Sequence, residues 1–339
     1  MFTFENVLDL PLIWGGLIGT AVLLYVLLDG FDLGVGILFP FAPSEKCQDK
    51  MMNSIAPFWD ANETWLVLGG GGLFAAFPLA YAIVMPALYI PVMAMLLALI
   101  FRGVAFEFRF KARARGRFWW GQAFHFGSLL AAFFQGAILG GITQGFVVQG
   151  RVFAGGAFDW LTAFSMVTGL GVVAGYALLG ATWTVMKNEG LTQSWARGAA
   201  EYALIIVAAV WGIVSLWVPT LHPHLLNRWM SEPNIYYLAV LPCLMLLVIF
   251  AASRSLIRGE QYWPFVWSSA IFLLGFVGIG VSLWPWVVPY TIPLAGAAAA
   301  GTSLSLMLVG AALMLPVILA YTAFCHYTFR GKVGAEPMY

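Results

Sequence analysis

Charge is scarce in this sequence. Only 9% of its 339 residues are Asp, Glu, Lys or Arg, while 62% are hydrophobic. Soluble domains carry about 25% charged residues, so the composition excludes an ordinary soluble protein and predicts a polytopic membrane protein in a lipid bilayer. Nucleic-acid-binding proteins usually have a large positive net charge, whereas this chain has a net charge of only +1. No nucleic-acid partner is therefore expected.

Cysteine and histidine are also rare. The three cysteines lie in well-separated segments: Cys47, Cys243 and Cys325. No C-x-x-C motif occurs, which favours inert thiols over disulfides or a metal centre. His222 and His224 flank one proline without further ligands, so no metal site is expected. A haem needs axial ligands that face inward from helices, and His125 is the only histidine on an early helix. Haem chemistry by this chain alone is therefore not expected.

Long apolar runs fill most of the chain. A membrane helix needs about 20 apolar residues. By that measure the sequence predicts nine spans: 12–39, 54–76, 80–107, 119–145, 159–186, 198–219, 236–252, 262–287 and 302–329. We predict one all-α integral-membrane domain over residues 1–339, built as two four-helix bundles plus one extra helix. Its expected parts are residues 1–150, 155–290 and 300–330.

The basic residues lie mostly on one side of the predicted spans. Segments after odd-numbered spans contain Lys46, Lys50, Arg109, Lys111, Arg113, Arg115, Arg117, Lys187, Arg197, Arg254, Arg258, Arg330 and Lys332. Segments after even-numbered spans contain only Arg151 and Arg228. Because basic loops stay in the cytoplasm, the N-terminus is predicted to be periplasmic and the C-terminus cytoplasmic.

Charged residues inside the spans are the strongest functional signal. They are Asp29 and Asp32 in the first span, Asp60 and Glu63 in the second, and Arg102 and Glu107 in the third. A charge in the hydrocarbon costs roughly 2.5–3.5 kcal/mol even on lenient insertion scales, so such residues mark function. The predicted orientation places all six in the cytoplasmic half of the membrane. Each acid pair in the first two spans has i, i+3 spacing and can share one helix face.

Two local signals accompany these charges. Ser54 followed by Pro57 is typical of a helix start and predicts that the second span begins there. Gly30, Gly34 and Gly36 in the first span leave room for another helix to approach closely. We therefore expect close helix–helix packing along the first span.

Intramembrane carboxylates that open toward one side serve a proton relay, an ion site or a structural ion pair. One alternative is that Arg102 neutralises one or two of the acids and locks the bundle. The acids outnumber this arginine, so some of them are expected to be protonated, which favours proton uptake. The alternative from another class is a proton- or cation-coupled secondary transporter. Transporters favour sites near the midplane between repeats, whereas these acids lie in one half.

The acidic segments carry motifs of a known family. The motifs are D-G-F-D-L-G-V-G (29–36), N-S-I-A-P-F-W-D-A-N-E-T-W-L (53–66), G-G-L-F-A-A-F-P (71–78), F-R-G-V-A-F-E-F-R (101–109) and L-P-V-I-L-A-Y-T-A-F-C (315–325). With them the chain resembles subunit II of the cytochrome bd-type quinol oxidases, of the shorter, cyanide-insensitive branch. The resemblance covers the whole chain and is densest in its first third.

The resemblance implies a respiratory complex in the bacterial cytoplasmic (inner) membrane that oxidises ubiquinol and reduces dioxygen to water. A larger subunit I would carry haem b and haem d, and small single-helix subunits accompany some members. Subunit II would contain no catalytic residue and no haem. It would stabilise subunit I and conduct protons from the cytoplasm. Some members also hold a structural quinone, for which this sequence shows no residue signature.

Several residues match the family's motifs one by one. Trp59 and Asp60 match its W-D, Asp29 and Asp32 match its D-G-F-D, and Arg102 matches the arginine of its third helix. Asp60 is the first candidate for the proton path. Trp59 and Arg102 are expected to have structural and charge-pairing roles.

Five acids make up the expected proton path: Asp60, Asp29, Asp32, Glu63 and Glu107. Two of them depart from the family's pattern. Many members read W-D-G-N-Q where this chain has W-D-A-N-E, so Glu63 adds a carboxylate. Many members have Asp where Glu107 stands. The extra carboxylate is expected either to reroute or to reinforce proton entry.

Overall fold

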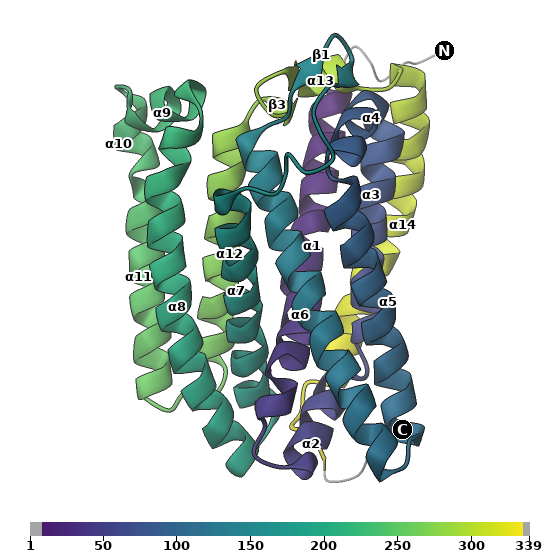
Figure 1. Cartoon of the computed structure of the whole chain (residues 1–339), viewed down its shortest axis with the longest axis vertical. Helices are drawn as coiled ribbons and strands as arrows, with labels where there is room; N and C mark the ends of the chain where they lie inside the picture. The colour runs from purple at the N-terminus through teal and green to yellow at the C-terminus, as the bar shows by residue number, and fades with distance from the viewer. Residues whose placement is uncertain (1–8, 335–339) are drawn as a thin grey trace.

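The computed structural model describes residues 9–334, which form long, roughly parallel helices (Figure 1). Within this range, eight helical segments are long and apolar enough to cross a membrane. They contain α1 (Leu10–Leu38), α5 (Tyr89–Lys111), α6 (Ala114–Gln144), α7 (Ala163–Lys187), α8 (Leu191–Leu221), α11 (Val240–Ile257), α12 (Trp263–Leu283) and α14 (Gly301–Thr328). The prediction of an all-helical polytopic membrane protein is confirmed, whereas the count of nine spans stays a prediction.

The predicted second span corresponds to α3 (Trp59–Ala76), and the helix start predicted at Ser54 is wrong. Ser54 lies in the last turn of α2 (Glu45–Ile55), where its hydroxyl donates a hydrogen bond of 2.7 Å to the Met51 carbonyl. Residues 56–58 form a turn before α3 begins. Pro57 lies in this turn rather than in a helix. The helix that carries Asp60 and Glu63 therefore begins at Trp59, only one residue before Asp60.

The predicted third span, 80–107, is divided into two helices. α4 (Pro78–Ala87) ends before Leu88, and α5 begins directly after that residue. Pro86 and Pro91 lie on either side of the break, and each lacks the N–H that would continue the helical hydrogen bonds. Arg102 and Glu107 are therefore both carried by α5, which is an uninterrupted helix.

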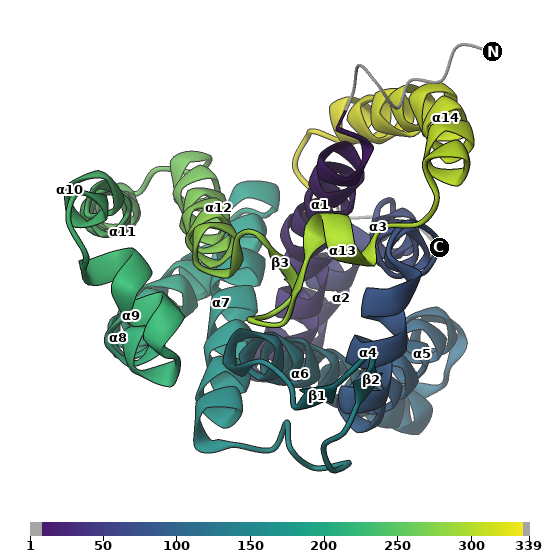
Figure 2. The same cartoon turned by 90° about the horizontal axis from the view of Figure 1, so that it is seen from above.

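Helix α1 lies near the middle of the molecule, with α3, α6 and α7 packed around it (Figure 2). Its glycines permit this packing, as the sequence predicted. A Cβ on Gly34 would overlap the α7 backbone at Tyr176, and a Cβ on Gly180 of α7 would overlap Gly34. A Cβ on Gly36 would overlap the Ser128 side chain of α6. The acidic end of α1 is thus the most closely packed part of this helix.

Short elements close one end of the bundle (Figure 1). Two antiparallel strand pairs that the sequence did not predict lie there: β1 (Val148–Gln149) with β2 (Val152–Phe153), and β3 (Trp286–Val288) with β4 (Ile292–Pro293). The same end holds α9 (Pro223–Met230), α10 (Asn234–Leu238) and α13 (Leu294–Ala297), whereas α2 lies at the opposite end. With the predicted orientation, the strand-bearing end is periplasmic.

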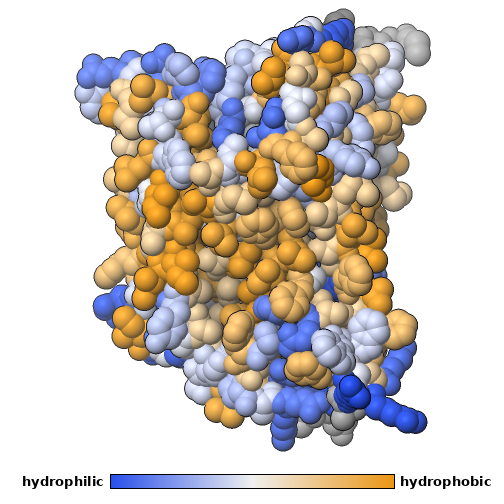
Figure 3. Space-filling view, in the orientation of Figure 1, coloured by the Kyte–Doolittle hydropathy of each residue, from blue (hydrophilic) through white to orange (hydrophobic). Residues whose placement is uncertain are grey.

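An apolar belt crosses the middle of the molecule between two polar ends (Figure 3). Large exposed hydrophobic side chains contribute to the surface of several helices, among them Leu216 of α8, Phe250 of α11 and Leu306 of α14. Such a surface is suited to lipid or to another membrane subunit rather than to water. The division into two four-helix bundles stays a prediction.

Candidate functional site

A buried arginine joins carboxylates from two other helices. Arg102 on α5 donates from Nη1 to Asp29 Oδ1 of α1 at 2.7 Å and to Glu63 Oε1 of α3 at 2.9 Å. Arg102 is 1% exposed and Asp29 is fully buried, whereas the Glu63 side chain is 29% exposed. Three segments that are distant in sequence therefore meet at one guanidinium. The structure brings together charges that the sequence placed only at a similar depth.

Asp32 is held by a neutral partner. The Asn62 amide of α3 donates to Asp32 Oδ2 at 2.7 Å and to the Leu28 carbonyl at 3.2 Å. Asp32 and Asn62 are both buried. Asp29, Asp32, Asn62, Glu63 and Arg102 together form what we call the acidic cluster. Asn62 was missed as a partner because an uncharged amide gives no charge signal in a sequence.

Charges and hydrogen bonds do not balance in the acidic cluster. Asp29, Asp32 and Glu63 are three carboxylates, and Arg102 is the cation that pairs with two of them. Within residues 9–334, Asp29 Oδ2, Asp32 Oδ1 and two Arg102 nitrogens are buried without a hydrogen-bond partner. Buried polar atoms are normally satisfied by protein groups or ordered water. The cluster therefore has the capacity to bind water molecules or additional protons.

A chain of uncharged polar groups extends from the acidic cluster. Tyr25 lies one turn before Asp29 on α1, and both side chains are buried. The Gln135 amide of α6 donates to the Tyr25 hydroxyl at 2.6 Å, and the Tyr176 hydroxyl of α7 donates to Gln135 Oε1 at 2.7 Å. Sequence reasoning missed this chain. The i−4 spacing of Tyr25 from Asp29 was the one signal that could have indicated it.

Asp60 and Glu107 lie outside these contacts. Asp60 is exposed in the first turn of α3, and Glu107 is partly exposed on α5. In the described part of the chain, neither side chain has an ion pair or a hydrogen bond. Trp59, next to Asp60, packs against Phe106 with ring centroids 5.0 Å apart, and the Arg102 guanidinium lies 5.9 Å from its ring centre. Trp59 thus supports the cluster from the side of α3.

A second group of charges lies at the α2 end of the bundle. Arg109 of α5 is 1% exposed and donates to Asp49 Oδ1 of α2 at 2.7 Å. Arg117 of α6 contacts the same carboxylate at 2.8 Å and Glu45 at 3.1 Å. The sequence analysis counted Arg109 and Arg117 among the basic residues after the third predicted span. In the structure these two arginines form ion pairs that hold α2 against α5 and α6.

Family membership follows from a sequence comparison. The family of cytochrome bd terminal oxidase subunit II has a sequence model that matches residues 10–329. The chain belongs to this family. It is a multi-pass membrane subunit of a quinol-oxidising, oxygen-reducing oxidoreductase, and it has subunit I as a partner. The resemblance read from the motifs is confirmed.

Individual relatives agree with this assignment over nearly their full length. The chain is 27% identical to the cytochrome bd-I ubiquinol oxidase subunit 2 of Escherichia coli (strain K12), across 97% of this chain and 96% of that protein. It is 29% identical to the cytochrome bd ubiquinol oxidase subunit 2 of Bacillus subtilis (strain 168), across 96% and 98%. A chain in the solved bd oxidase of Geobacillus thermodenitrificans has the same fold, with a TM-score of 0.75, 16% identity and coverage of 95% and 99%.

The residues described here give little support to a metal site in this chain. Within residues 9–334, no group of three or more His, Cys, Asp and Glu side chains is placed to hold a metal ion. The His125 imidazole of α6 contacts the Gly36 carbonyl through Nδ1 at 3.2 Å. One such histidine would supply a single axial ligand. The acidic cluster, rather than a metal centre, is the candidate functional site.

Proposed function

We propose that this chain holds no haem itself, stabilises the haem-bearing subunit I, and conducts protons from the cytoplasm toward the oxygen-reducing site. In this proposal the haems of subunit I, b and d, and ubiquinol supply the electron chemistry. Protons consumed in oxygen reduction come from the cytoplasm, and quinol oxidation releases protons on the periplasmic side. The small single-helix subunits and the structural quinone stay expectations from the resemblance.

The acidic cluster is the observation that carries this proposal. Arg102 pairs with two of the carboxylates, Asp29 and Glu63, and the third, Asp32, accepts only from the neutral Asn62 amide. The acids outnumber the cation, so one proton can be added or lost at low electrostatic cost. Glu63 connects the buried Asp29 to the surface of α3, because its carboxylate contacts Arg102 while the side chain remains 29% exposed. Asp60 lies less than one turn away on that same helix.

The surface around Asp60 supports a docking face for subunit I. Asp60 is exposed in the first turn of α3, the helix in the predicted second span, and a carboxylate facing lipid would cost roughly 2.5–3.5 kcal/mol. Farther along α3, Gly70 and Gly71 lie beside open space, because a Cβ at either position would have no neighbour within 4 Å. Small residues let a partner helix approach closely. We infer that subunit I covers this face and receives protons across it.

The test is the substitution Asp60→Asn in the assembled oxidase. We expect lower quinol-oxidase turnover with unchanged haem b and d absorbance, because the amide keeps the size of the side chain but cannot carry a proton. Full turnover would show that Asp60 is not on an obligatory proton path. The matched control is Glu260→Gln, an acid at the surface between α11 and α12.

A purely structural role for the acids predicts a different result. In that case Asp60→Asn, Asp29→Asn and Glu63→Gln would lower the amount of assembled complex while each assembled complex turned over normally. Measuring haem content and turnover on the same preparations separates the two roles. The transporter alternative is not favoured, because the family match covers residues 10–329.

A further inference from the structure

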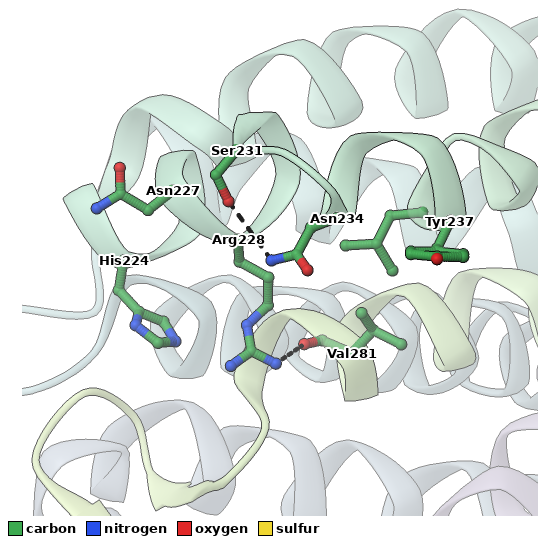
Figure 4. Close-up of a pocket in the computed structure, with 8 residues that line it drawn as sticks. His224, Asn227, Arg228, Ser231, Asn234, Tyr237 and Val281 are labelled. Atoms are coloured by element: carbon green, nitrogen blue, oxygen red, sulfur yellow. Dashed lines mark hydrogen bonds between the residues drawn. The ribbon is translucent and has the colours of Figure 1, made fainter.

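A polar pocket lies between α9, α10 and α12 at the strand-bearing end of the molecule (Figure 4). It has a volume of about 470 Å³. Its lining comes from α9, α10, α12 and the turn between α9 and α10: His224, Asn227, Arg228, Ser231, Asn234, Tyr237, Leu238 and Val281. The Trp229 indole donates to Ser282 Oγ at 3.0 Å, which fixes α9 against α12 beside the pocket.

Hydrogen-bond donors converge in this pocket. Arg228 donates from Nη1 to the Val281 carbonyl at 3.2 Å, which orients the guanidinium and leaves its other N–H groups for a ligand (Figure 4). His224 Nε2 is buried and has no partner in the described part of the chain. Burial and the nearby Arg228 charge lower the pKa of His224, so its imidazole is neutral at pH 7. Asn227 and Asn234 add amide groups.

The charge in the pocket is not compensated. None of the lining residues is acidic, and Arg228 has no ion pair within residues 9–334. Segments predicted to be periplasmic contain only two basic residues, Arg151 and Arg228, and one of them is in this pocket. A half-buried guanidinium surrounded by neutral donors is suited to an oxyanion, and its fork matches phosphate geometry.

The position of the pocket indicates where such a phosphate comes from. Exposed apolar side chains continue from the pocket along the two helices: Val240 and Leu244 of α11, and Val277 of α12. Val277 is four residues before the lining residue Val281 on α12, so the two lie on one face of that helix. Leu244 follows Tyr237 by seven residues in the helical segment Asn234–Ile257, which includes α10 and α11. An acyl chain can therefore lie on this apolar surface while its headgroup occupies the pocket.

We propose that this pocket binds the phosphate group of a phospholipid from the periplasmic leaflet. Arg228 pairs with the phosphate oxygens, and His224, Asn227 and Asn234 complete the hydrogen bonds. The site is independent of the proton path, because none of its residues belongs to the acidic cluster. It gives the peripheral helices α11 and α12 a lipid contact at their outer end.

The test is to count phospholipids that remain bound to the purified complex, by native mass spectrometry in mild detergent. Arg228→Gln should remove a single bound phospholipid relative to the wild-type complex. Asn234→Leu should do the same by filling the pocket, and it leaves the Arg228–Val281 hydrogen bond in place. Arg151→Gln, at the other basic residue of this side, is the matched control and should retain the full number.

Each other outcome would overturn the proposal. An unchanged phospholipid number in Asn234→Leu would show that the pocket holds no lipid, even if Arg228→Gln failed to assemble. Equal losses in all three variants would show that the loss is not specific to the pocket. If radiolabelled inorganic phosphate bound the wild type and not Arg228→Gln, with lipid number unchanged, the ligand would be free phosphate rather than a lipid.

Discussion

Arg102 determines the electrostatic state of the acidic cluster. It is the guanidinium between Asp29 and Glu63; Arg102 and Asp29 are buried, and Glu63 is partly exposed. Removing one partner of a buried ion pair leaves an uncompensated charge, which is costlier than the pair itself is stabilising. The neighbouring Asp32 depends on Asn62 instead, so the two buried aspartates respond to different substitutions.

We predict that Arg102→Met destabilises the protein by about 3–5 kcal/mol, because Asp29 and Glu63 lose their cation. The measurement is the melting temperature and yield of the purified complex. Adding Asp29→Asn to this variant should recover part of the loss, since one buried negative charge disappears. Arg254→Met, at an exposed position, is the control. Equal melting temperatures of Arg102→Met and the wild type would contradict the importance of the ion pair.

Gln135 gives a second residue-scale prediction. Gln135→Leu removes two hydrogen bonds and leaves the buried Tyr25 and Tyr176 hydroxyls without this partner, at about 1–3 kcal/mol for each unsatisfied group. We expect a lower melting temperature because the two hydroxyls lose their partner. We expect normal turnover per haem because an amide does not pass protons readily. A loss of turnover at a normal melting temperature would instead make the tyrosine chain part of the proton path.

The residues of the site were predictable to the extent that they are charged. Asp29, Asp32 and Arg102 stand out in an apolar sequence because burying a charge is costly wherever it falls. The uncharged Asn62, Tyr25 and Gln135 carry no such signal, since amides and phenols occur in many membrane helices without function. Only the three-dimensional packing of α1, α3, α6 and α7 shows that these groups meet.

At the scale of helices, the apolar runs predicted the positions of the long helices better than the residues at which helices begin and end. The long spans followed from composition, because about 20 apolar residues are needed to cross the hydrocarbon. Composition did not predict the turn at residues 56–58 or the break at Leu88, although prolines lie near both. A proline ends some membrane helices and lies within others, as Pro316 inside α14 illustrates. Tertiary contacts decide between these outcomes.

Helix packing can be tested at the contact between α1 and α7. Gly34→Ala places a methyl group against the α7 backbone, and overpacking of this kind costs about 1–3 kcal/mol or more. We expect a lower yield and melting temperature of the complex. Gly212→Ala in α8 is the matched control, because a Cβ there meets no atom within 4 Å. Similar behaviour of the two variants would show that α1 can move away from α7.

For the whole molecule, the distribution of basic residues and the position of the short elements imply one orientation. The strand-bearing end contains Arg151 and Arg228, whereas α2 and the charge group around Asp49 lie at the other end. Basic residues favour the cytoplasm. This orientation decides on which side of the membrane the proposed proton path, docking face and lipid pocket would lie.

Cysteine labelling in intact cells tests the orientation. In a variant without the native cysteines, Arg151→Cys in the β1–β2 turn should react with a membrane-impermeant maleimide. Gln261→Cys, between α11 and α12, should react only after the membrane is opened. Both positions are exposed in the structure, so accessibility to the reagent depends on the side of the membrane. The reverse labelling pattern would invert the predicted topology.

The contact between Gly34 and Gly180 has a mechanical consequence for the acids nearby. Gly34 lies two residues from Asp32, and there the α1 and α7 backbones touch with no side chain between them. Such a contact resists both rotation and sliding of α1, because any movement would drive backbone atoms into each other. The acids are thus held on a stiff support. If the proposed proton path is active, protons must move by the rotation of hydroxyls and water molecules, because the helices that carry the acids stay still.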